Sequence, residues 1–171
     1  METYCGHMRT LHDALLVIEA CARNVLPRVR HRLSDRERTL VRSGTVFVWD
    51  EGETGMRRWT DGRSWSPSRV VGGFLTYREL AGRRQRLAGE LDSAADALAG
   101  GGGRNNAGRR EFNYQADGLI KRALSLRTTF GRRWHLISYY RESDVAQYQL
   151  ALPSADPRLV QITIPAGVYP D

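Results

Sequence analysis

Residues Arg57 to Arg69 read Arg-Arg-Trp-Thr-Asp-Gly-Arg-Ser-Trp-Ser-Pro-Ser-Arg, and no other stretch of the chain puts so much chemistry into so few positions. Asp61-Gly62 is a turn signal, because glycine adopts the positive φ that most residues avoid. A turn at this point is expected to push Arg63 outward. Ser66-Pro67 is typical of a helix start, with serine as the N-cap and proline at the first helical position.

The groups in this stretch suit a polyanion. Guanidinium groups, hydroxyls and the free N–H groups of a helix start are what proteins offer to phosphate oxygens, and an arginine at a loop tip can enter a narrow groove. The stretch therefore favours DNA as a ligand. The residues leave an alternative open, in which this is a surface hairpin with solvated arginines and with tryptophans packed in the core.

Composition points to an acidic partner. The chain has 171 residues and a net charge of +7, with a pI near 10, and Lys121 is its only lysine. A surplus of arginine suits phosphate and base edges better than lysine does. No apolar run approaches the roughly 20 residues that span a bilayer, the first residues lack a signal-peptide pattern, and no long helix pairs a basic face with an apolar one. We expect an intracellular protein with no membrane partner.

Catalytic and metal-binding patterns are missing from the sequence. Cys5, His7, His12 and Cys21 have a spacing that fits none of the common zinc-finger patterns. We find no phosphate-binding glycine motif, nucleophile elbow or metalloprotease helix, and His135 is expected to be a core histidine of an apolar strand. The chain is therefore expected to be no enzyme and to bind no metal, cofactor or small-molecule substrate.

The first part of the chain carries helix signals. Thr10 and Asp13 resemble a capping box for a helix over residues 11–24, which should end before Pro27. Ser34 and Glu37 can cap a second, short helix in the same way. Between them the chain is strongly basic, and its arginines are either a solvated face or a rail along DNA phosphates. The candidate rail residues are Arg28, Arg30 and Arg32.

Short β-branched and aromatic runs predict strands. The expected strands are Thr45–Trp49 paired with Met56–Thr60 in a hairpin, Phe74–Leu80, Leu119–Leu126 paired with Trp134–Tyr140, and an edge strand at Leu159–Ile164. A short helix is expected over Ser143–Tyr148, capped by Ser143 or Asp144. Residues 83–110 keep helical spacing at first and then become rich in glycine, which predicts a weak helix followed by a flexible linker.

The sequence is similar to the Gti1/Pac2 family of fungal transcriptional regulators, whose DNA-binding module is called the WOPR domain. The segments that carry the resemblance are Ser43–Trp49, Arg58–Arg69, Phe74–Glu79, Asp117–Arg122, His135–Tyr140 and Leu150–Pro153. It implies an α+β fold of two interlocked lobes of antiparallel sheet with short helices, joined by a variable linker. The lobes would be residues 1–82 and 111–165, with the linker at 83–110 and a tail at 166–171.

The resemblance also implies a function. We expect sequence-specific binding of double-stranded DNA in a fungal nucleus, at a short A/T-rich element, with the arginine loop in the minor groove. Arg63 is expected to enter the groove, because A/T-rich minor grooves are narrow and strongly negative, and Trp59 to hold the loop together with Trp65. The expected DNA-contacting residues are Arg57, Arg58, Thr60, Asp61, Gly62, Arg63, Ser64, Trp65, Ser66, Ser68 and Arg69, with Lys121 and Arg122 from the second lobe.

Thr60 is a candidate phosphorylation site. Arg57-Arg58-Trp59-Thr60 matches the acceptor pattern of a basophilic protein kinase, which would be a second partner. Two other functions stay open. A single-stranded nucleic-acid binder would need exposed aromatic rings such as Trp59 and Tyr77 to stack on bases. A protein-interaction module would keep the same core without binding duplex DNA.

Overall fold

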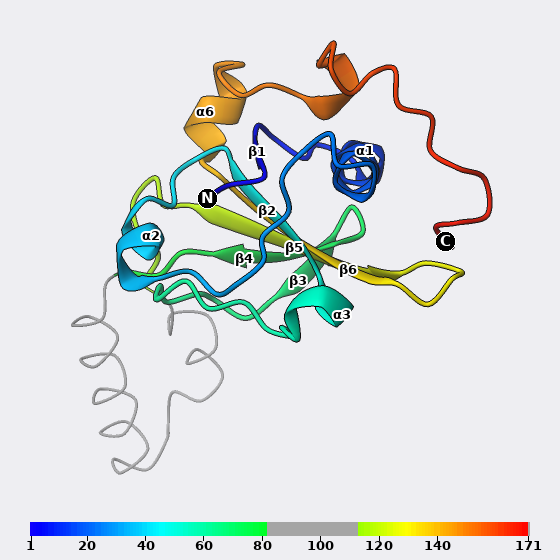
Figure 1. Ribbon diagram of the computed structural model, residues 1–171. Helices are drawn as coiled ribbons and strands as arrows, with labels where there is room; N and C mark the ends of the chain where they lie inside the picture. The colour runs from blue at the N-terminus through cyan, green and yellow to red at the C-terminus, as the bar shows by residue number, and fades with distance from the viewer. Residues whose placement is uncertain (82–112, 171) are drawn as a thin grey trace.

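An antiparallel sheet organises the computed structural model, which describes residues 1–81 and 113–170 (Figure 1). The sheet has six strands in the order β1-β2-β6-β5-β4-β3. The strands are β1 (Tyr4–Cys5), β2 (Thr45–Asp50), β3 (Arg69–Val71), β4 (Phe74–Arg78), β5 (Ile120–Arg127) and β6 (Arg133–Tyr140). The helical elements are α1 (Leu11–Ala22), α2 (Asp35–Thr39), α3 (Glu51–Thr54), α6 (Glu142–Ala146) and the 3-10 turn η1 (Pro153–Ala155).

The two halves of the chain interlock within this sheet. The β5–β6 hairpin of the second half is inserted between β2 and β4 of the first half, so that Trp49 lies opposite His135 and Leu75 opposite Ala123. β2 and β4 do not pair with each other. Each pairs with the inserted hairpin along one edge and with a short strand, β1 or β3, along the other. The α+β class is confirmed. The helix and linker predicted at residues 83–110, and with them the lobe boundaries, lie outside the described residues.

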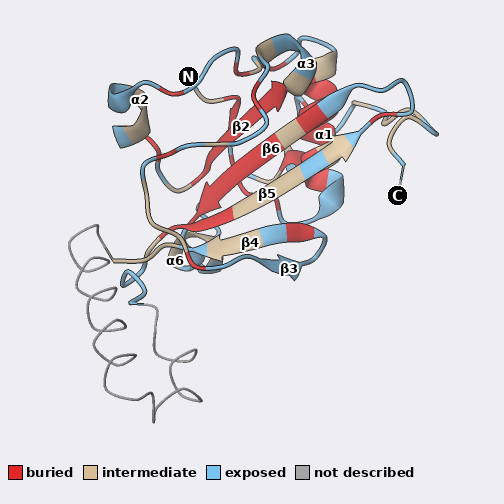
Figure 2. Cartoon of the chain, turned by 90° about the horizontal axis from the view of Figure 1, so that it is seen from below, coloured by how far each residue is buried: buried red, intermediate tan, exposed pale blue. Residues whose placement is uncertain are grey.

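Apolar side chains cover both faces of the central strands. On one face, Val46 and Leu136 pack against Val17 and Ile18 of α1. On the other face, Phe47 packs with a second cluster that includes the residues Trp49, Met56, Ile137 and Tyr139. Every residue of β2 is buried, as expected for a strand covered on both sides. Figure 2 shows the contrast with β4 and β5, which carry exposed and half-exposed positions.

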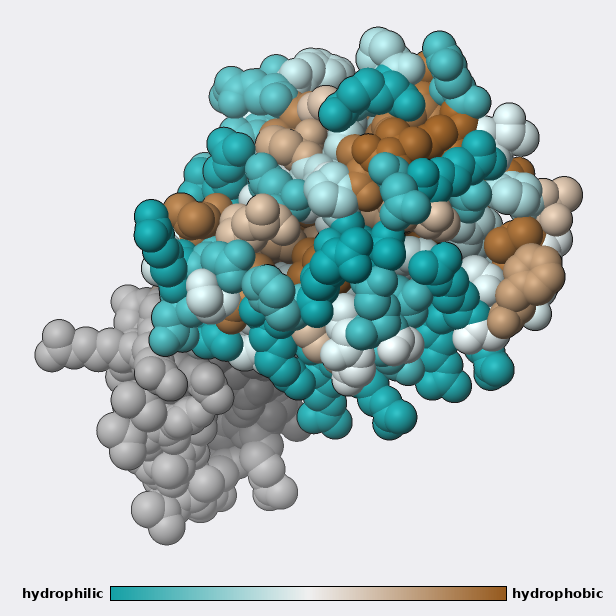
Figure 3. All heavy atoms as spheres, in the orientation of Figure 1, coloured by the Kyte–Doolittle hydropathy of each residue, from teal (hydrophilic) through white to brown (hydrophobic). Residues whose placement is uncertain are grey.

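The surface is mostly hydrophilic on the side seen in Figure 1. Figure 3 shows polar side chains over most of this face, with hydrophobic side chains gathered where α1 lies in Figure 1. In the part of the chain that the structure describes, no helix has the length and apolar character that a membrane span requires.

Locally encoded elements match their predictions. Both capping boxes form, with Thr10 and Asp13 at the start of α1 and Ser34 and Glu37 at the start of α2. The predicted pairing of Leu119–Leu126 with Trp134–Tyr140 is confirmed as β5 and β6. The predicted strands at Thr45–Trp49 and Phe74–Leu80 are confirmed as β2 and β4.

Other predicted elements are wrong. Met56–Thr60 is no strand, because α3 follows β2 directly and β2 takes β1 and β6 as its neighbours. Leu159–Ile164 is no strand either, since its N–H groups close turns, Leu159 to Asp156 and Ile162 to Leu159. The helix predicted at Ser143–Tyr148 exists as α6 but starts at Glu142 without a side-chain cap.

Candidate nucleic-acid interface

The arginine loop, which we define as residues Arg57–Arg69, is anchored first by aromatic side chains. The indole N–H of Trp49 donates to the Met56 carbonyl over 2.9 Å and fixes the point where the loop begins. The Trp59 ring stacks on Trp49 with centroids 4.9 Å apart, and its centroid lies 4.7 Å from that of Phe47. Trp59 therefore turns inward, as predicted, and holds the first half of the loop on the sheet.

Asp61 is a buried hub of this loop. Its carboxylate accepts hydrogen bonds from the Arg63 N–H at 3.0 Å, the Trp65 indole N–H at 3.0 Å and the Tyr139 hydroxyl at 2.6 Å. Only 6% of Asp61 is exposed. Burial and the neighbouring Asp61 charge raise the pKa of Tyr139 well above its ordinary value, so its proton stays in place. Other groups of the protein thus occupy the Asp61 carboxylate, and its expected contact with DNA stays a prediction.

Lys121 completes the hub from β5. Its ammonium nitrogen lies 3.6 Å from Asp61 Oδ2, 4.5 Å from the Trp65 ring centroid and 4.8 Å from that of Tyr77. Burial lowers the pKa of Lys121, while Asp61 opposes that shift. Lys121 and Trp65 thus face each other within the protein surface layer, and their expected contacts with DNA stay predictions.

Arg122 points to the opposite face of the sheet. Its Nη1 donates to the Met8 carbonyl over 2.7 Å, and its guanidinium lies over the rings of Phe74 and Tyr140. Adjacent residues of a strand face opposite sides, so Lys121 and Arg122 lie on different faces of the sheet. The expected DNA contacts of this pair stay a prediction, and they would have to come from two different faces.

Arg63 is held by the protein. Gly62 adopts a φ of +76°, as the turn signal predicted. However, Arg63 Nη1 donates to Glu79 Oε2 over 2.7 Å and Nη2 donates to the Val41 carbonyl over 3.1 Å. The side chain is 27% exposed. The prediction that the turn pushes Arg63 outward is wrong, because the guanidinium finds a carboxylate and a carbonyl within reach.

The second half of the loop pairs with the strand region around β4. The Ser66 N–H donates to the Arg78 carbonyl, and the Arg78 N–H donates to Ser66 Oγ over 3.0 Å. Likewise, Ser64 accepts the N–H of Leu80. Ser66 is buried and begins no helix, because its N–H and hydroxyl are already used in strand-like pairing that continues into β3.

The exposed residues of the loop form the remaining surface. They are Arg57, Arg58, Thr60, Gly62, Pro67, Ser68 and Arg69. The guanidinium groups of Arg57, Arg58 and Arg69 make no hydrogen bond or ion pair with any residue of the described ranges 1–81 and 113–170. A rigid loop thus presents free cations to solvent, which can bind phosphate without first breaking an internal ion pair.

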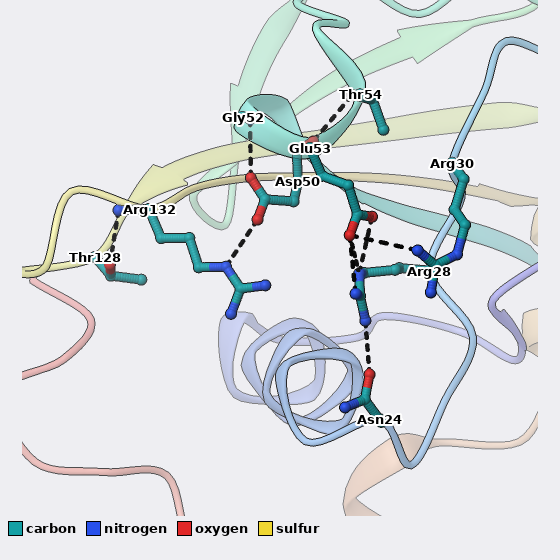
Figure 4. Close-up of polar contacts among 9 residues, drawn as sticks. All are labelled: Asn24, Arg28, Arg30, Asp50, Gly52, Glu53, Thr54, Thr128 and Arg132. Atoms are coloured by element: carbon teal, nitrogen blue, oxygen red, sulfur yellow. Dashed lines mark hydrogen bonds and ion pairs between the residues drawn. The ribbon is translucent and has the colours of Figure 1, made fainter.

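The three arginines of the predicted phosphate rail differ in their partners, and Figure 4 shows two of them, Arg28 and Arg30, at the Glu53 carboxylate. Arg28 Nε donates to Glu53 Oε1 over 2.9 Å and Nη1 donates to Asn24 Oδ1 over 2.7 Å, and the side chain is 14% exposed. Arg30 lies 3.5 Å from the same Glu53 carboxylate. Arg32 is exposed and its guanidinium has no bonded partner among the described residues. The charge of Glu53 therefore offsets that of Arg28, whereas Arg32 keeps its full charge for a ligand.

Sequence reasoning missed the acidic residues of this region. Asp50 pairs with Arg132, Glu51 with Arg133 and His135, and Glu53 with Arg28. A signal was present, since three carboxylates stand at the end of the apolar run of β2 and in α3. Their partners could not be read from it, and neither could the pairing of Glu79 with Arg63, because ion pairs between distant segments leave no spacing pattern.

His135 lies beside this acidic group and packs on Trp49, with ring centroids 4.9 Å apart. Its ring nitrogens bond Ser125 Oγ and Glu51 Oε1. Among residues 1–81 and 113–170, no cluster of three or more His, Cys, Asp or Glu residues could hold a metal ion.

The chain is similar to members of one known protein family. The model of the Gti1/Pac2 family matches residues 3–107. The cAMP-independent regulatory protein pac2 of Schizosaccharomyces pombe is 44% identical over 197 residues, an alignment that covers 100% of this chain and 83% of pac2. The global transcription regulator sge1 of Gibberella fujikuroi is 35% identical over 195 residues, which cover 92% of this chain and 57% of that relative.

A solved structure agrees with these relatives. The WOPR domain of Wor1 in Candida albicans, in complex with a 13bp dsDNA, superposes with a TM-score of 0.73 at 31% identity. The match covers 98% of this chain and 93% of the Wor1 chain. By sequence and by fold, this chain belongs to the Gti1/Pac2 family.

Proposed function

We propose that this chain is a nuclear, DNA-binding transcription regulator that recognises double-stranded DNA through the arginine loop. The observation that carries the proposal is the set of free guanidiniums at Arg57, Arg58 and Arg69 on a loop anchored by Trp59 and Asp61. The related Wor1 domain, solved with double-stranded DNA, supports the same ligand.

Anchoring of the loop favours tight binding. Binding to DNA costs the entropy of every side chain and loop that must become ordered. The Asp61 hub and the stacked Trp59 ring fix the backbone before DNA arrives, so this cost falls mainly on the arginine side chains. Free arginines also release counterions from the phosphates without losing an internal partner.

We assign the minor-groove contact to Arg58. A/T-rich minor grooves are narrow and strongly negative, which favours an inserted guanidinium. Arg63 would have to leave Glu79 and Val41 to enter a groove, whereas Arg58 is exposed and directly precedes the anchored Trp59. A short A/T-rich element is therefore the proposed target, with Arg57 and Arg69 on the flanking phosphates.

A protein kinase acting at Thr60 is the proposed regulator of this surface. Thr60 is exposed and lies two positions after Arg58. A phosphate there adds about −1.5 to −2 charges beside the arginines that bind DNA phosphates. Phosphorylation would therefore oppose DNA binding.

The alternative of single-stranded binding has less support. Trp59 packs on Trp49 and Phe47, and the ammonium of Lys121 lies over the ring of Tyr77, so both half-buried rings already have a face in contact with the protein. A stacking platform for unpaired bases needs exposed rings. The geometry therefore favours duplex DNA.

The test is selection of bound duplexes from a random DNA library, followed by affinity measurements on the selected site at two salt concentrations. We expect one A/T-rich site to be enriched. Arg58→Ala should cost about 1–3 kcal/mol and relax the sequence preference, and Arg57→Ala should weaken binding to all duplexes alike. Arg141→Ala is the matched control, because Arg141 is an exposed arginine outside the arginine loop, at the start of α6.

Other outcomes would reject the proposal. No duplex binding at low salt would leave a protein-interaction module, and stronger binding to single strands would restore the stacking alternative. Salt-sensitive binding without any enriched site would reject sequence-specific recognition.

A further inference from the structure

The turn between β5 and β6 presents an exposed aromatic side chain that DNA binding through the arginine loop does not use. Phe130 is 86% exposed at the tip of this hairpin. We call residues Arg127–Arg133 the hairpin tip. Figure 1 shows the tip projecting from the end of the sheet opposite α2. The apex of the arginine loop lies near α2, since the Cδ of Arg38 is the nearest neighbour of a Cβ placed on Gly62.

The hairpin tip is held in one conformation by hydrogen bonds. The Thr128 N–H donates to the Arg132 carbonyl over 2.7 Å, and the Gly131 N–H donates back to the Thr128 carbonyl over 2.9 Å. The Thr129 N–H donates to the Val168 carbonyl, which ties the tip to the C-terminal segment. Phe130 is thus displayed on an ordered turn, and its binding to a partner would require little further ordering.

The charges around Phe130 distinguish the hairpin tip from the arginine loop. Arg132 donates to Asp50 over 2.7 Å and Arg133 donates to Glu51 over 3.2 Å. Arg127 is exposed and makes no hydrogen bond or ion pair within the described part of the chain. Carboxylates of β2 and α3 thus offset most of the positive charge that phosphate binding would need. An aromatic anchor beside one free arginine is instead the composition of a protein–protein hot spot.

We propose that the hairpin tip docks a protein partner. Phe130 enters an apolar pocket of that partner, and Arg127 pairs with a carboxylate at the rim of the pocket. The partner is therefore an acidic protein surface or segment with an apolar centre. This site goes beyond the DNA binding proposed above, and because the tip and the loop apex lie at different ends of the sheet, both ligands can be held together.

A displayed library of random short peptides, selected against the whole chain, tests the proposal. We expect enriched peptides that combine an apolar residue with Asp or Glu. Phe130→Ser should weaken the binding of a selected peptide by about tenfold or more, which corresponds to a hot-spot residue. Arg127→Glu should shift the selection toward peptides with Lys or Arg. Tyr148→Ser is the matched control, because Tyr148 is an equally exposed aromatic residue outside the hairpin tip.

The unfolding temperature and the duplex affinity of each variant show whether a loss of peptide binding comes from unfolding or from the DNA-binding surface. We expect both quantities to equal those of the unsubstituted chain. Equal peptide binding by Phe130→Ser and the unsubstituted chain would overturn the proposal. A loss of duplex affinity in Phe130→Ser would also overturn it and make the tip a DNA contact. Failure of Arg58→Ala to affect duplex binding would count against the proposed function alone.

Discussion

The Tyr139 hydroxyl donates to Asp61 Oδ2 over 2.6 Å, although 78 positions separate the two residues in the sequence. The same hydroxyl accepts the indole N–H of Trp59 over 2.8 Å. One phenol thus joins two residues of the first half of the loop to β6, which belongs to the second half of the chain. The arginine loop can have its shape only when the β5–β6 hairpin is in place.

Asp61→Asn is expected to destabilise the protein. Asparagine keeps the size of the side chain but leaves the buried Lys121 ammonium without a counter-charge. Breaking one partner of a buried ion pair typically costs about 3–5 kcal/mol. Urea unfolding should show this loss in the free energy of unfolding. Asp35→Asn, at a fully exposed carboxylate, is the control and should change it by less than about 0.5 kcal/mol. If Asp61→Asn unfolded at the same urea concentration as the unsubstituted chain, the Asp61 charge would not stabilise Lys121.

Arg28→Ala should affect the stability of the protein, whereas Arg32→Ala should affect DNA binding. Arg28 is bound by Glu53 and Asn24, so its loss should lower the free energy of unfolding by about 1 kcal/mol and leave the salt dependence of DNA binding unchanged. Arg32 is exposed without a bonded partner, so its loss should reduce the salt slope by about 1 and spare stability. DNA affinity at several salt concentrations and urea unfolding measure the two effects. A reduced salt slope of DNA binding for Arg28→Ala would show that Arg28 contacts phosphate.

Thr60→Glu should weaken duplex binding. The new carboxylate lies beside Arg58 and repels DNA phosphates, so affinity should fall by about threefold to tenfold at low salt, with a smaller difference at high salt because salt screens exposed charges. Fluorescence anisotropy with a labelled duplex measures the effect. Thr60→Gln has the same shape without the charge and should bind like the unsubstituted chain. If the Thr60→Glu and Thr60→Gln variants bound the duplex with equal affinity, a negative charge at Thr60 would not oppose DNA binding.

The free energy of unfolding should fall as the pH drops from 6.5 to 4. His7 is buried against the Tyr140 ring, and burial, assisted by Arg122, lowers the pKa of His7 from 6.5 to about 4. In this window the unfolded chain binds the proton and the folded chain does not, so acid favours unfolding by up to about 3 kcal/mol. The contribution is complete above pH 6.5.

Urea unfolding of His7→Gln measures that contribution. This variant should lose less stability than the unsubstituted chain between pH 6.5 and 4.5, because glutamine does not titrate. Carboxylates with a lowered pKa, such as Glu51 and Glu53, are common to both proteins and cancel in the difference. If the free energy of unfolding of both proteins changed in parallel with pH, protonation of His7 would not account for the loss of stability in acid.

Local signals in the sequence predicted local structure well. The capping boxes at Thr10 and Ser34 depend on residues three positions apart, and both form. Strands β5 and β6 are joined by a short turn, and their pairing was predicted. The predicted hairpin return at Met56–Thr60 is wrong because the apolar run of β2 does not say which strand lies beside it. Its two neighbours are β1, from the start of the chain, and β6, from the distant second half.

In the candidate site, too, local features were predictable and contacts between distant residues were not. The positive φ of Gly62 and the inward Trp59 follow from residue types, since turn chemistry and burial of indole rings are local properties. Which arginines are free does not follow, because Arg57 and Arg63 are the same residue type in the same stretch. Glu79 and Val41 bind Arg63, and no residue of the described chain binds Arg57.

The sequence by itself determined the arginine-rich charge, the caps, the turn and the apolar strands, because each depends on residue type and on neighbours a few positions away. Tertiary structure decided that Lys121 and Asp61 are buried together, that α3 offsets Arg28 and that Phe130 is left exposed. These outcomes depend on which distant groups come within a few ångströms, and charge pairing and desolvation act over that range whatever the separation along the chain.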